Sequence, residues 1–277
     1  MNSAVIGLRR DWWLARLAAA NVPPLRPRVP FRVGGVPVGS VEPGFLEKIA
    51  HSGLLDGQCA LQKTEQQGWD ICGDADTALA ALAAAMRTLG CAGAWRDELL
   101  AVCDHNGVRC AVIERAAVRP LGITTHAVHL VGAHADGRVW VQQRSLDKAT
   151  DPGRWDTLVG GMVPASDDTL AALVRESWEE AGLLPVQVGQ PQYRGRLRIT
   201  RPTADAGGVG QVVEDIDWYH VVLPADCAPR NQDGEVQGFA LLDADTLGKW
   251  LQEDRFTLDA SLMLGQFLLD NGVPLLG

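Results

Sequence analysis

Residues 160–183 read GGMVPASDDTLAALVRESWEEAGL, and this stretch decides the fold. Its middle part predicts a helix over residues 168–181. Ser166 or Asp167 can cap the N-terminus of that helix, and Asp168 suits its positive end. Small and apolar side chains recur at helical spacing and form one face, made of Leu170, Leu173, Val174, Ser177 and Ala181. Gly182 fits the left-handed position that often follows a helix, so the helix is expected to end there.

Three glutamates share one stripe of this predicted helix. Glu176, Glu179 and Glu180 lie at positions i, i+3 and i+4, beside the apolar face. Like charges at this spacing destabilise an isolated helix. A solvated acidic face would explain a lone E-x-x-E-E, but the adjoining Gly-Gly turn, Arg175 and Gly182 would then be coincidences. A divalent cation makes such a cluster favourable, and hard carboxylate ligands suit Mg²⁺ or Mn²⁺.

The whole segment resembles the Nudix box, G-x5-E-x7-R-E-U-x-E-E-x-G-U, where U is aliphatic. The positions that match in register are Gly161, Arg175, Glu176, Glu179, Glu180, Gly182 and Leu183. Asp167 stands where the family has Glu, and Ser177 replaces an aliphatic residue. The shorter Asp167 is expected to need a water or a small backbone shift to pair with Arg175. The hydroxyl of Ser177 can bond to the Leu173 carbonyl, so neither change removes a metal-binding carboxylate.

This resemblance implies a set of metal ligands. Glu176 and Glu180 would be the principal ligands, Glu179 would assist, and the carbonyl of Gly160 would add another. A further carboxylate usually comes from a later loop, and Glu235 is the candidate here. Asp233 is its rival, and an exposed turn acid with no such role is an equal alternative for Glu235.

The remaining box residues would support the chemistry. Arg175 would orient a glutamate, and Gly161, Asp167 and Gly182 would hold the motif together. The implied reaction is attack of water on a phosphorus atom of a diphosphate, with metal neutralising charge on the phosphate oxygens. The general base stays open among Glu176, Glu179 and Glu235.

Three residues near the loop at 144–156 are candidates for substrate binding. Arg144 or Lys148 could hold a terminal phosphate, with an ordinary surface cation as the alternative for each. Trp155 could stack on an aromatic ring of the substrate, although a core position is the simpler expectation. His126 and His129 point to opposite faces of a predicted strand, so they are not expected to share a metal.

The fold expected around this motif is α+β. Residues 124–144 predict a hairpin around Asp136-Gly137, and further strands are expected at 186–199, at 212–223 and in VQGFALL. Helices are expected at 243–254 and 259–271. The resemblance implies a Nudix α/β/α sandwich with a mixed sheet over residues 119–277.

A smaller α/β domain is expected over residues 1–118. Residues 31–41 predict a hairpin, 43–55 a helix, 58–63 and 68–72 a strand pair, and 74–90 a clear helix. A short amphipathic helix ending near Pro23 is expected before them. This domain is expected to contribute either to the substrate pocket or to a homodimer contact.

Motifs outside the box narrow the resemblance. FRVGGVPVGSV, IERAAVRPLGI, RSLDKATDPGRWD and LPADCAPRNQDGEVQGF resemble a subfamily in which an uncharacterised N-terminal domain precedes the Nudix domain. That subfamily includes the Nudix part of fungal thiamine pyrophosphokinase fusions. It implies hydrolysis of thiamine diphosphate or of its oxidised or damaged analogues. A nucleotide pyrophosphohydrolase, acting on a damaged dNTP or a dinucleoside diphosphate, is the second hypothesis, and a non-catalytic ligand-binding module is the third.

Composition excludes several classes of partner. The chain has 277 residues, 47% of them hydrophobic, and a net charge of -9. An acidic protein is a poor ligand for a nucleic-acid polymer, so a small phosphorylated substrate is expected instead. Six cysteines without a C-x-x-C pair indicate reduced thiols and a cytoplasmic location. Charged residues interrupt the apolar N-terminal stretch, so neither a signal peptide nor a membrane span is expected.

Overall fold

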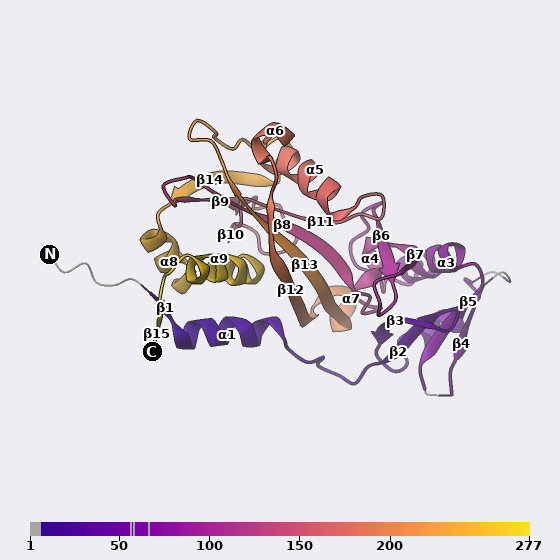
Figure 1. The fold of residues 1–277 in the computed structure, drawn as a ribbon. Coiled ribbons are helices and arrows are strands. Elements are labelled where there is room, and N and C mark those ends of the chain that lie inside the picture. The colour runs from indigo at the N-terminus through magenta and orange to yellow at the C-terminus, as the bar shows by residue number, and fades with distance from the viewer. Residues whose placement is uncertain (1–6, 56, 58, 66) are drawn as a thin grey trace.

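A mixed sheet of seven strands dominates the computed structural model, which describes residues 7–55, 57, 59–65 and 67–277 (Figure 1). The strands are β8 (Thr125–Ala133), β9 (Val139–Arg144), β10 (Trp155–Asp156), β11 (Val159–Met162), β12 (Gln192–Thr203), β13 (Gly210–Val222) and β14 (Val236–Leu242). Their main order is β10-β9-β8-β13-β12, with β11 also pairing with β8 and β14 with β9. β8 and β13 run parallel, whereas the other pairs are antiparallel. The expected mixed sheet is therefore confirmed.

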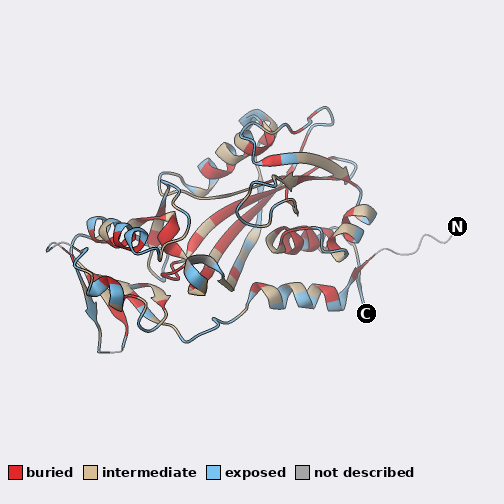
Figure 2. Cartoon of the chain, turned by 180° about the vertical axis from the view of Figure 1, so that it is seen from behind, coloured by how far each residue is buried: buried red, intermediate tan, exposed pale blue. Residues whose placement is uncertain are grey.

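Helices cover both faces of this sheet. On one side lie α5 (Thr169–Ala181) and α6 (Pro185–Val188), and on the other lie α8 (Ala244–Gln252) and α9 (Leu258–Asp270). Strand β8 serves both layers, because Val128 and Leu130 pack with α5 while Ala127 and Val131 pack with α9. Figure 2 shows buried residues along the central strands and on the sheet-facing sides of the helices. The α/β/α sandwich is confirmed, and a short helix α7 (Asp205–Gly208) joins β12 to β13.

The first half of the chain builds a second core. Its four-stranded sheet has the order β3-β2-β5-β4, from β2 (Val29–Val33), β3 (Val36–Val41), β4 (Ala60–Lys63) and β5 (Trp69–Cys72). Helix α3 (Ala75–Thr88), the hairpin β6 (Leu99–Cys103) with β7 (Arg109–Glu114), and α4 (Arg115–Val118) complete it. The predicted hairpin at 31–41, the strand pair and the helix at 74–90 are confirmed in these elements. Residues 58 and 66 lie outside the described residues.

One predicted helix of the first half is much shorter than expected. Only α2 (Glu47–Ala50) is helical in the segment 43–55. Turns flank it on both sides, and Gly44 has a φ of 85°. A residue in that left-handed conformation cannot belong to a right-handed helix, so the helix starts after it.

The first described helix packs against the second half of the chain. Helix α1 (Arg10–Ala20) buries Trp12 and Ala20 in the same core as Leu264 and Phe267 of α9. Strand β1 (Leu8–Arg9) pairs with β15 (Leu275–Leu276) beside it. Residues 8–20 therefore pack with the large sheet, whereas the sequence predicts that they belong to a smaller domain over residues 1–118. In the described part of the chain, no helix is long and apolar enough to cross a membrane.

Candidate active site

Helix α5 begins at a capped position and ends at a glycine. The carboxylate of Asp168 accepts a hydrogen bond of 2.8 Å from the Ala171 amide, so Asp168 is the N-cap rather than Ser166 or Asp167. Gly182 follows the helix with a φ of 63°, as expected for a left-handed cap. Ser177 is fully buried, and its hydroxyl donates to the Leu173 carbonyl at 2.6 Å. The apolar face tolerates this serine because its polar atom is satisfied within the helix.

Asp167 has a different task from capping. Arg175 Nε donates to Asp167 Oδ2 at 3.0 Å, so the shorter side chain reaches the arginine without a bridging water. Through Nη1, the same guanidinium donates to Glu176 Oε1 at 3.0 Å and to Glu179 Oε2 at 2.8 Å. Arg175 therefore fixes the orientation of two glutamates while Asp167 fixes the orientation of Arg175.

Glu180 is the most deeply buried carboxylate of the stripe. Its side chain is 1% exposed, and Oε2 accepts hydrogen bonds from the Gly160 amide at 2.9 Å and from Gln142 Nε2 at 2.8 Å. The nearest cation is Lys148, whose Nζ lies 3.8 Å from Oε1. Burial raises the pKa of Glu180 to about 7, because these partners compensate only part of the lost hydration. Burial also raises the pKa of Glu176 above its ordinary value.

The Gly-Gly turn allows the backbone of β11 to approach these side chains. A Cβ atom at Gly161 would lie 2.6 Å from Glu176 Cγ and nearer still to the carboxylate. A Cβ atom at Gly160 would overlap the ring of His129. Both positions therefore require glycine for close approach rather than for an unusual φ.

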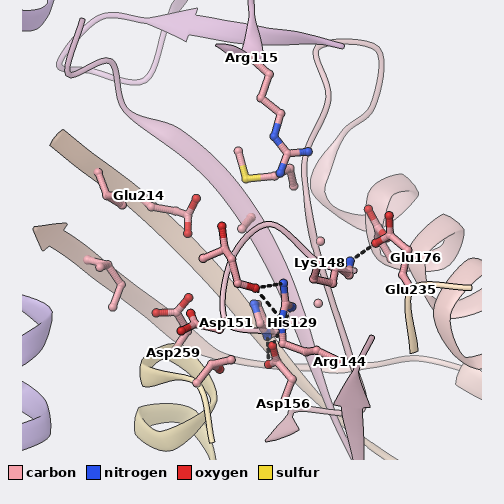
Figure 3. A pocket seen from close by; sticks show the side chains of 18 of the residues that line it. Arg115, His129, Arg144, Lys148, Asp151, Asp156, Glu176, Glu214, Glu235 and Asp259 are labelled. Carbon is pink, nitrogen blue, oxygen red and sulfur yellow. Dashed lines mark hydrogen bonds and ion pairs between the residues drawn. The ribbon is translucent and has the colours of Figure 1, made fainter. Parts of the chain in front are cut away.

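A cavity of about 410 Å³ opens beside this turn (Figure 3). Its wall next to α5 includes Gly160, Gly161, Arg175, Glu176 and Glu179. A second wall comes from β12, β13 and the start of α9, and includes Ile199, Arg201, Val212, Glu214, Thr257 and Asp259. Figure 3 shows Glu176, Lys148 and Glu235 on one side, with Glu214 and Asp259 across the cavity from them. The volume suits a small-molecule ligand.

Of the three residues at 144–156 that were predicted to bind substrate, two line the cavity. Lys148 lines the cavity and forms an ion pair with Glu235, which lines it too. Burial lowers the pKa of the Lys148 ammonium. Arg144 also lines the cavity, but it donates to Asp156 Oδ2 at 3.1 Å and to the Thr150 carbonyl, so its donors are largely occupied. Asp233, the rival of Glu235, lies at the cavity as well.

Trp155 lies elsewhere. Its ring packs on that of Trp250 with centroids 5.0 Å apart, within the core below the sheet. It does not belong to the described residues that line the cavity. The simpler expectation of a core position therefore describes Trp155, and the structure gives no support to stacking on a substrate.

Several cavity residues were not identified in the sequence. Glu98, Arg115 and Arg119 reach the cavity from the first half of the chain, and Arg115 Nη1 pairs with Glu98 Oε2 at 2.7 Å. Residues of the first half therefore line the cavity, in keeping with one of the two roles expected for that half, a contribution to the substrate pocket. Glu214 and Asp259 were also missed. An acidic side chain between Val212 and Ile216, on the inward face of a predicted strand, was the available indication for Glu214.

The glutamates on α5, together with Glu235, lie against basic side chains of the protein. Among the residues that the structure describes, no three His, Cys, Asp or Glu side chains already form a group that could hold a metal ion. Arg175 bridges Glu176 and Glu179, and Lys148 neutralises Glu235 and approaches Glu180. The donor chemistry still fits a hard divalent cation, because the glutamates and the Gly160 backbone meet at one end of the cavity.

Several known proteins resemble parts of this chain. A profile of the NUDIX domain matches residues 124–262. Nudix hydrolase 24, chloroplastic, of Arabidopsis thaliana is 34% identical over 173 residues, covering 58% of this chain and 44% of the relative. An isopentenyl-diphosphate Delta-isomerase of Streptomyces avermitilis is 29% identical over 161 residues, covering 57% of this chain and 78% of the isomerase. The crystal structure of DR0079 from Deinococcus radiodurans aligns with a TM-score of 0.44 and 18% identity, over 62% of this chain and 98% of that one.

These matches differ in how much they cover. The chain spans less than half of the length of the Arabidopsis relative, so similarity to it concerns the shared region alone. The NUDIX profile, in contrast, spans the box, the large sheet and most of the cavity walls. Because that profile covers half of the 277 residues, the chain belongs to the NUDIX domain family.

Proposed function

We propose that the chain is a metal-dependent diphosphatase that hydrolyses a diphosphate linkage in a small substrate. The observation that carries the proposal is the position of Glu176, Glu179 and Glu180 on one helix against the Gly160-Gly161 turn, with Glu176 and Glu179 lining a ligand-sized cavity. A structural helix gains nothing from three acids packed at this spacing. Such a cluster becomes favourable when it binds a hard divalent cation such as Mg²⁺ or Mn²⁺.

In this proposal each box residue has a defined role. Glu176, Glu179, Glu180 and Glu235 would hold the metal, with the Gly160 carbonyl as a further donor. Such an ion neutralises charge on phosphate oxygens and lowers the pKa of water. Arg175, fixed by Asp167, keeps the carboxylates of Glu176 and Glu179 in place, and either of these or Glu235 would accept the proton of the attacking water.

Lys148 would bind substrate in the same arrangement. Its ammonium stands between Glu180 and Glu235, and its side chain is only 19% exposed. When a metal neutralises those carboxylates, the ammonium is free to bind a phosphate oxygen in the same cavity. Arg144, which holds the loop through Asp156 and Thr150, would position Lys148 rather than contact phosphate.

Thiamine diphosphate, or an oxidised or damaged analogue of it, is the substrate class that we favour. Support comes from the outer motifs, because three of them supply cavity residues. IERAAVRPLGI contains Arg115 and Arg119, RSLDKATDPGRWD contains Lys148 and Asp151, and LPADCAPRNQDGEVQGF contains Asp233 and Glu235. Damaged dNTPs and dinucleoside diphosphates are the alternative substrates. A cytoplasmic location and a homodimer contact stay predictions, the former in keeping with six free cysteines.

A release assay tests the proposal. Purified chain is incubated with thiamine diphosphate, its oxidised forms and a nucleotide panel, with Mg²⁺, Mn²⁺ or EDTA, and inorganic phosphate and monophosphate products are measured. We expect release with metal only, and its loss in Glu180→Gln. The matched control is Glu253→Gln, an exposed glutamate at the end of α8. Full activity of Glu180→Gln would refute the metal role of Glu180.

The isomerase similarity provides a second candidate activity. Isopentenyl diphosphate is added to the same panel, and its conversion to an isomer is measured beside phosphate release. Isomer formation without phosphate release would replace the hydrolase proposal. Metal-dependent ligand binding without any turnover would instead identify a binding module.

A further inference from the structure

Glu214 is an acid on the face of the large sheet that packs against α9. Its strand neighbours on that face, Val212 and Ile216, are buried in the core below the sheet. The adjacent acids Asp215 and Asp217 point the other way, and each pairs with an arginine of β12. Glu214 accepts a hydrogen bond of 3.0 Å from Thr125 Oγ1, but it has no ion pair with any residue that the structure describes.

Asp259 faces the same part of the cavity from the first turn of α9. A negative charge is favourable at a helix N-terminus, but this does not explain why the side chain of Asp259 is buried. Its Oδ1 atom is buried and has no hydrogen-bond partner among the described residues. Burial, followed by the charges of Glu214, Asp156 and Asp151, raises the pKa of Asp259 to about 7. A buried oxygen without a partner is costly, and such atoms are rare unless a ligand satisfies them.

The charge of this end of the cavity is negative. Asp151, Glu214 and Asp259 line it without an ion pair to a described residue, whereas Asp156 is neutralised by Arg144. Arg201 lines it too, and its Nε atom is buried without a partner among the described residues. Arg115 and Arg119 line the cavity beside Glu214, and Arg115 is paired with Glu98. Apolar atoms complete the wall, from Ala127, Ile199 and Val212.

We propose that Glu214 and Asp259, with Asp151, form a subsite for a positively charged nitrogen group on the organic part of the substrate. Figure 3 shows these acids across the cavity from Glu176 and Lys148, where the proposed function places the diphosphate. One end of the cavity would thus bind phosphate oxygens and the other an organic cation. The apolar wall suits a heteroaromatic ring better than a hydrated metal ion. This inference depends on the proposed function only for the position of the diphosphate.

The test measures binding without hydrolysis. Thiamine carries a fixed positive charge and no phosphate, and thiochrome is its uncharged fused-ring relative. Both are titrated by calorimetry, in metal-free buffer, into the wild type, Glu214→Gln, Asp259→Asn and the control Asp215→Asn. Asp215 is matched in strand and charge but lies on the opposite face of the sheet, paired with Arg198. Titration of Mn²⁺ alone into the same proteins is the third arm.

We expect thiamine to bind the wild type and the control equally. Each of the two cavity variants should weaken thiamine binding about tenfold or more, as expected for loss of one partly desolvated charge partner. Thiochrome should bind more weakly and equally to all four proteins. Equal thiamine affinity in Glu214→Gln, Asp259→Asn and wild type would overturn the subsite. The subsite would also be overturned if thiamine did not bind the wild type and the two variants lost one bound Mn²⁺. That result would identify a metal site instead.

Failure of the proposed function gives a different result. If thiamine binds as expected but no diphosphate is hydrolysed, the subsite stands and the diphosphatase proposal fails. If diphosphates are hydrolysed but the substrate preference ignores the charge of the organic part, the subsite fails alone. Should a variant not fold, as judged by circular dichroism, the thiamine and thiochrome comparison on the wild type decides the outcome.

Discussion

Replacing Glu180 with glutamine should stabilise the metal-free protein while abolishing its activity. Glu180 is 1% exposed, and its pKa is raised from 4.5 to about 7 by burial. A difference of that size corresponds to roughly 3 kcal/mol, since one pKa unit is about 1.4 kcal/mol. The folded state binds the proton more tightly than the unfolded state. Stability is therefore highest below the ordinary pKa and falls as the pH rises through about 7.

Glutamine can keep the hydrogen bonds of Glu180. Its amide oxygen can accept from the Gly160 amide, as the carboxylate does now. The same oxygen can keep the hydrogen bond from Gln142 Nε2, because Oε2 of Glu180 accepts from both groups. The amide nitrogen then takes the place of Oε1. The variant therefore loses the buried charge and keeps both hydrogen bonds, and Lys148 keeps Glu235 as its partner.

Urea unfolding in EDTA measures this effect. Near pH 5 the free energies of unfolding of wild type and Glu180→Gln should agree within about 1 kcal/mol, and near pH 8 the variant should be more stable by roughly 1–3 kcal/mol. Glu253→Gln, the exposed control, should show no such pH dependence. Added Mg²⁺ or Mn²⁺ should reverse the order near pH 8, because only the wild type gains the stability of full metal binding.

Two results would refute this reasoning. If the variant were less stable than the wild type by the same margin at both pH values, the buried carboxylate would not be the source of the pH dependence. If metal raised the unfolding free energies of both proteins equally, Glu180 would not be a ligand. The experiment therefore tests the burial of Glu180 and its proposed role separately.

Three further substitutions test the support of the site. Gly161→Ala places a Cβ atom 2.6 Å from Glu176 Cγ, so phosphate release should fall about 100-fold while circular dichroism shows a retained fold; unchanged release would show that the close approach is not needed. Asp167→Ala frees Arg175 Nε and should lower activity or metal affinity about 10–100-fold, whereas Asp167→Glu, the family residue, should retain both. Ser177→Ala should change the free energy of unfolding by less than about 1 kcal/mol, because the lost hydroxyl bonded only within its own helix; a larger loss by urea titration would contradict that account.

The parts of the site that the sequence predicted depend on local interactions. The helix of the box could be predicted because its cap, its helical periodicity and Gly182 lie within one short segment. Of the face expected to be apolar, Leu173, Ser177 and Ala181 are buried. Leu170 and Val174, expected on the same face, are exposed. Its N-cap was assigned one or two residues too early, since Ser166, Asp167 and Asp168 are all good caps. The structure shows Asp167 bonded directly to Arg175, the pairing that the box resemblance implied, and this leaves Asp168 to cap the helix.

The rest of the cavity depends on contacts between distant segments. Glu98, Glu214 and Asp259 come from three regions of the chain, and no local spacing connects them. Asp259 looks like an ordinary acid in a first helical turn, so its missing partner is visible only in three dimensions. Helix α1 shows the same limit, because sequence order placed it with residues 1–118 while Trp12 packs against the core of the large sheet.

The first half of the chain bears on the active site through the loop before α5. The Ala165 amide donates to the Leu99 carbonyl at 2.8 Å, and Arg109 donates to the Ala165 carbonyl at 2.7 Å. Both bonds hold the segment that leads to Asp167, and Asp167 in turn holds Arg175. The hairpin β6–β7 therefore fixes the box from outside the NUDIX region, at the same edge where Glu98 and Arg115 close the cavity. Because the same segment both supports the helix and forms a wall, the first half of the chain and the glutamates of α5 are parts of one site.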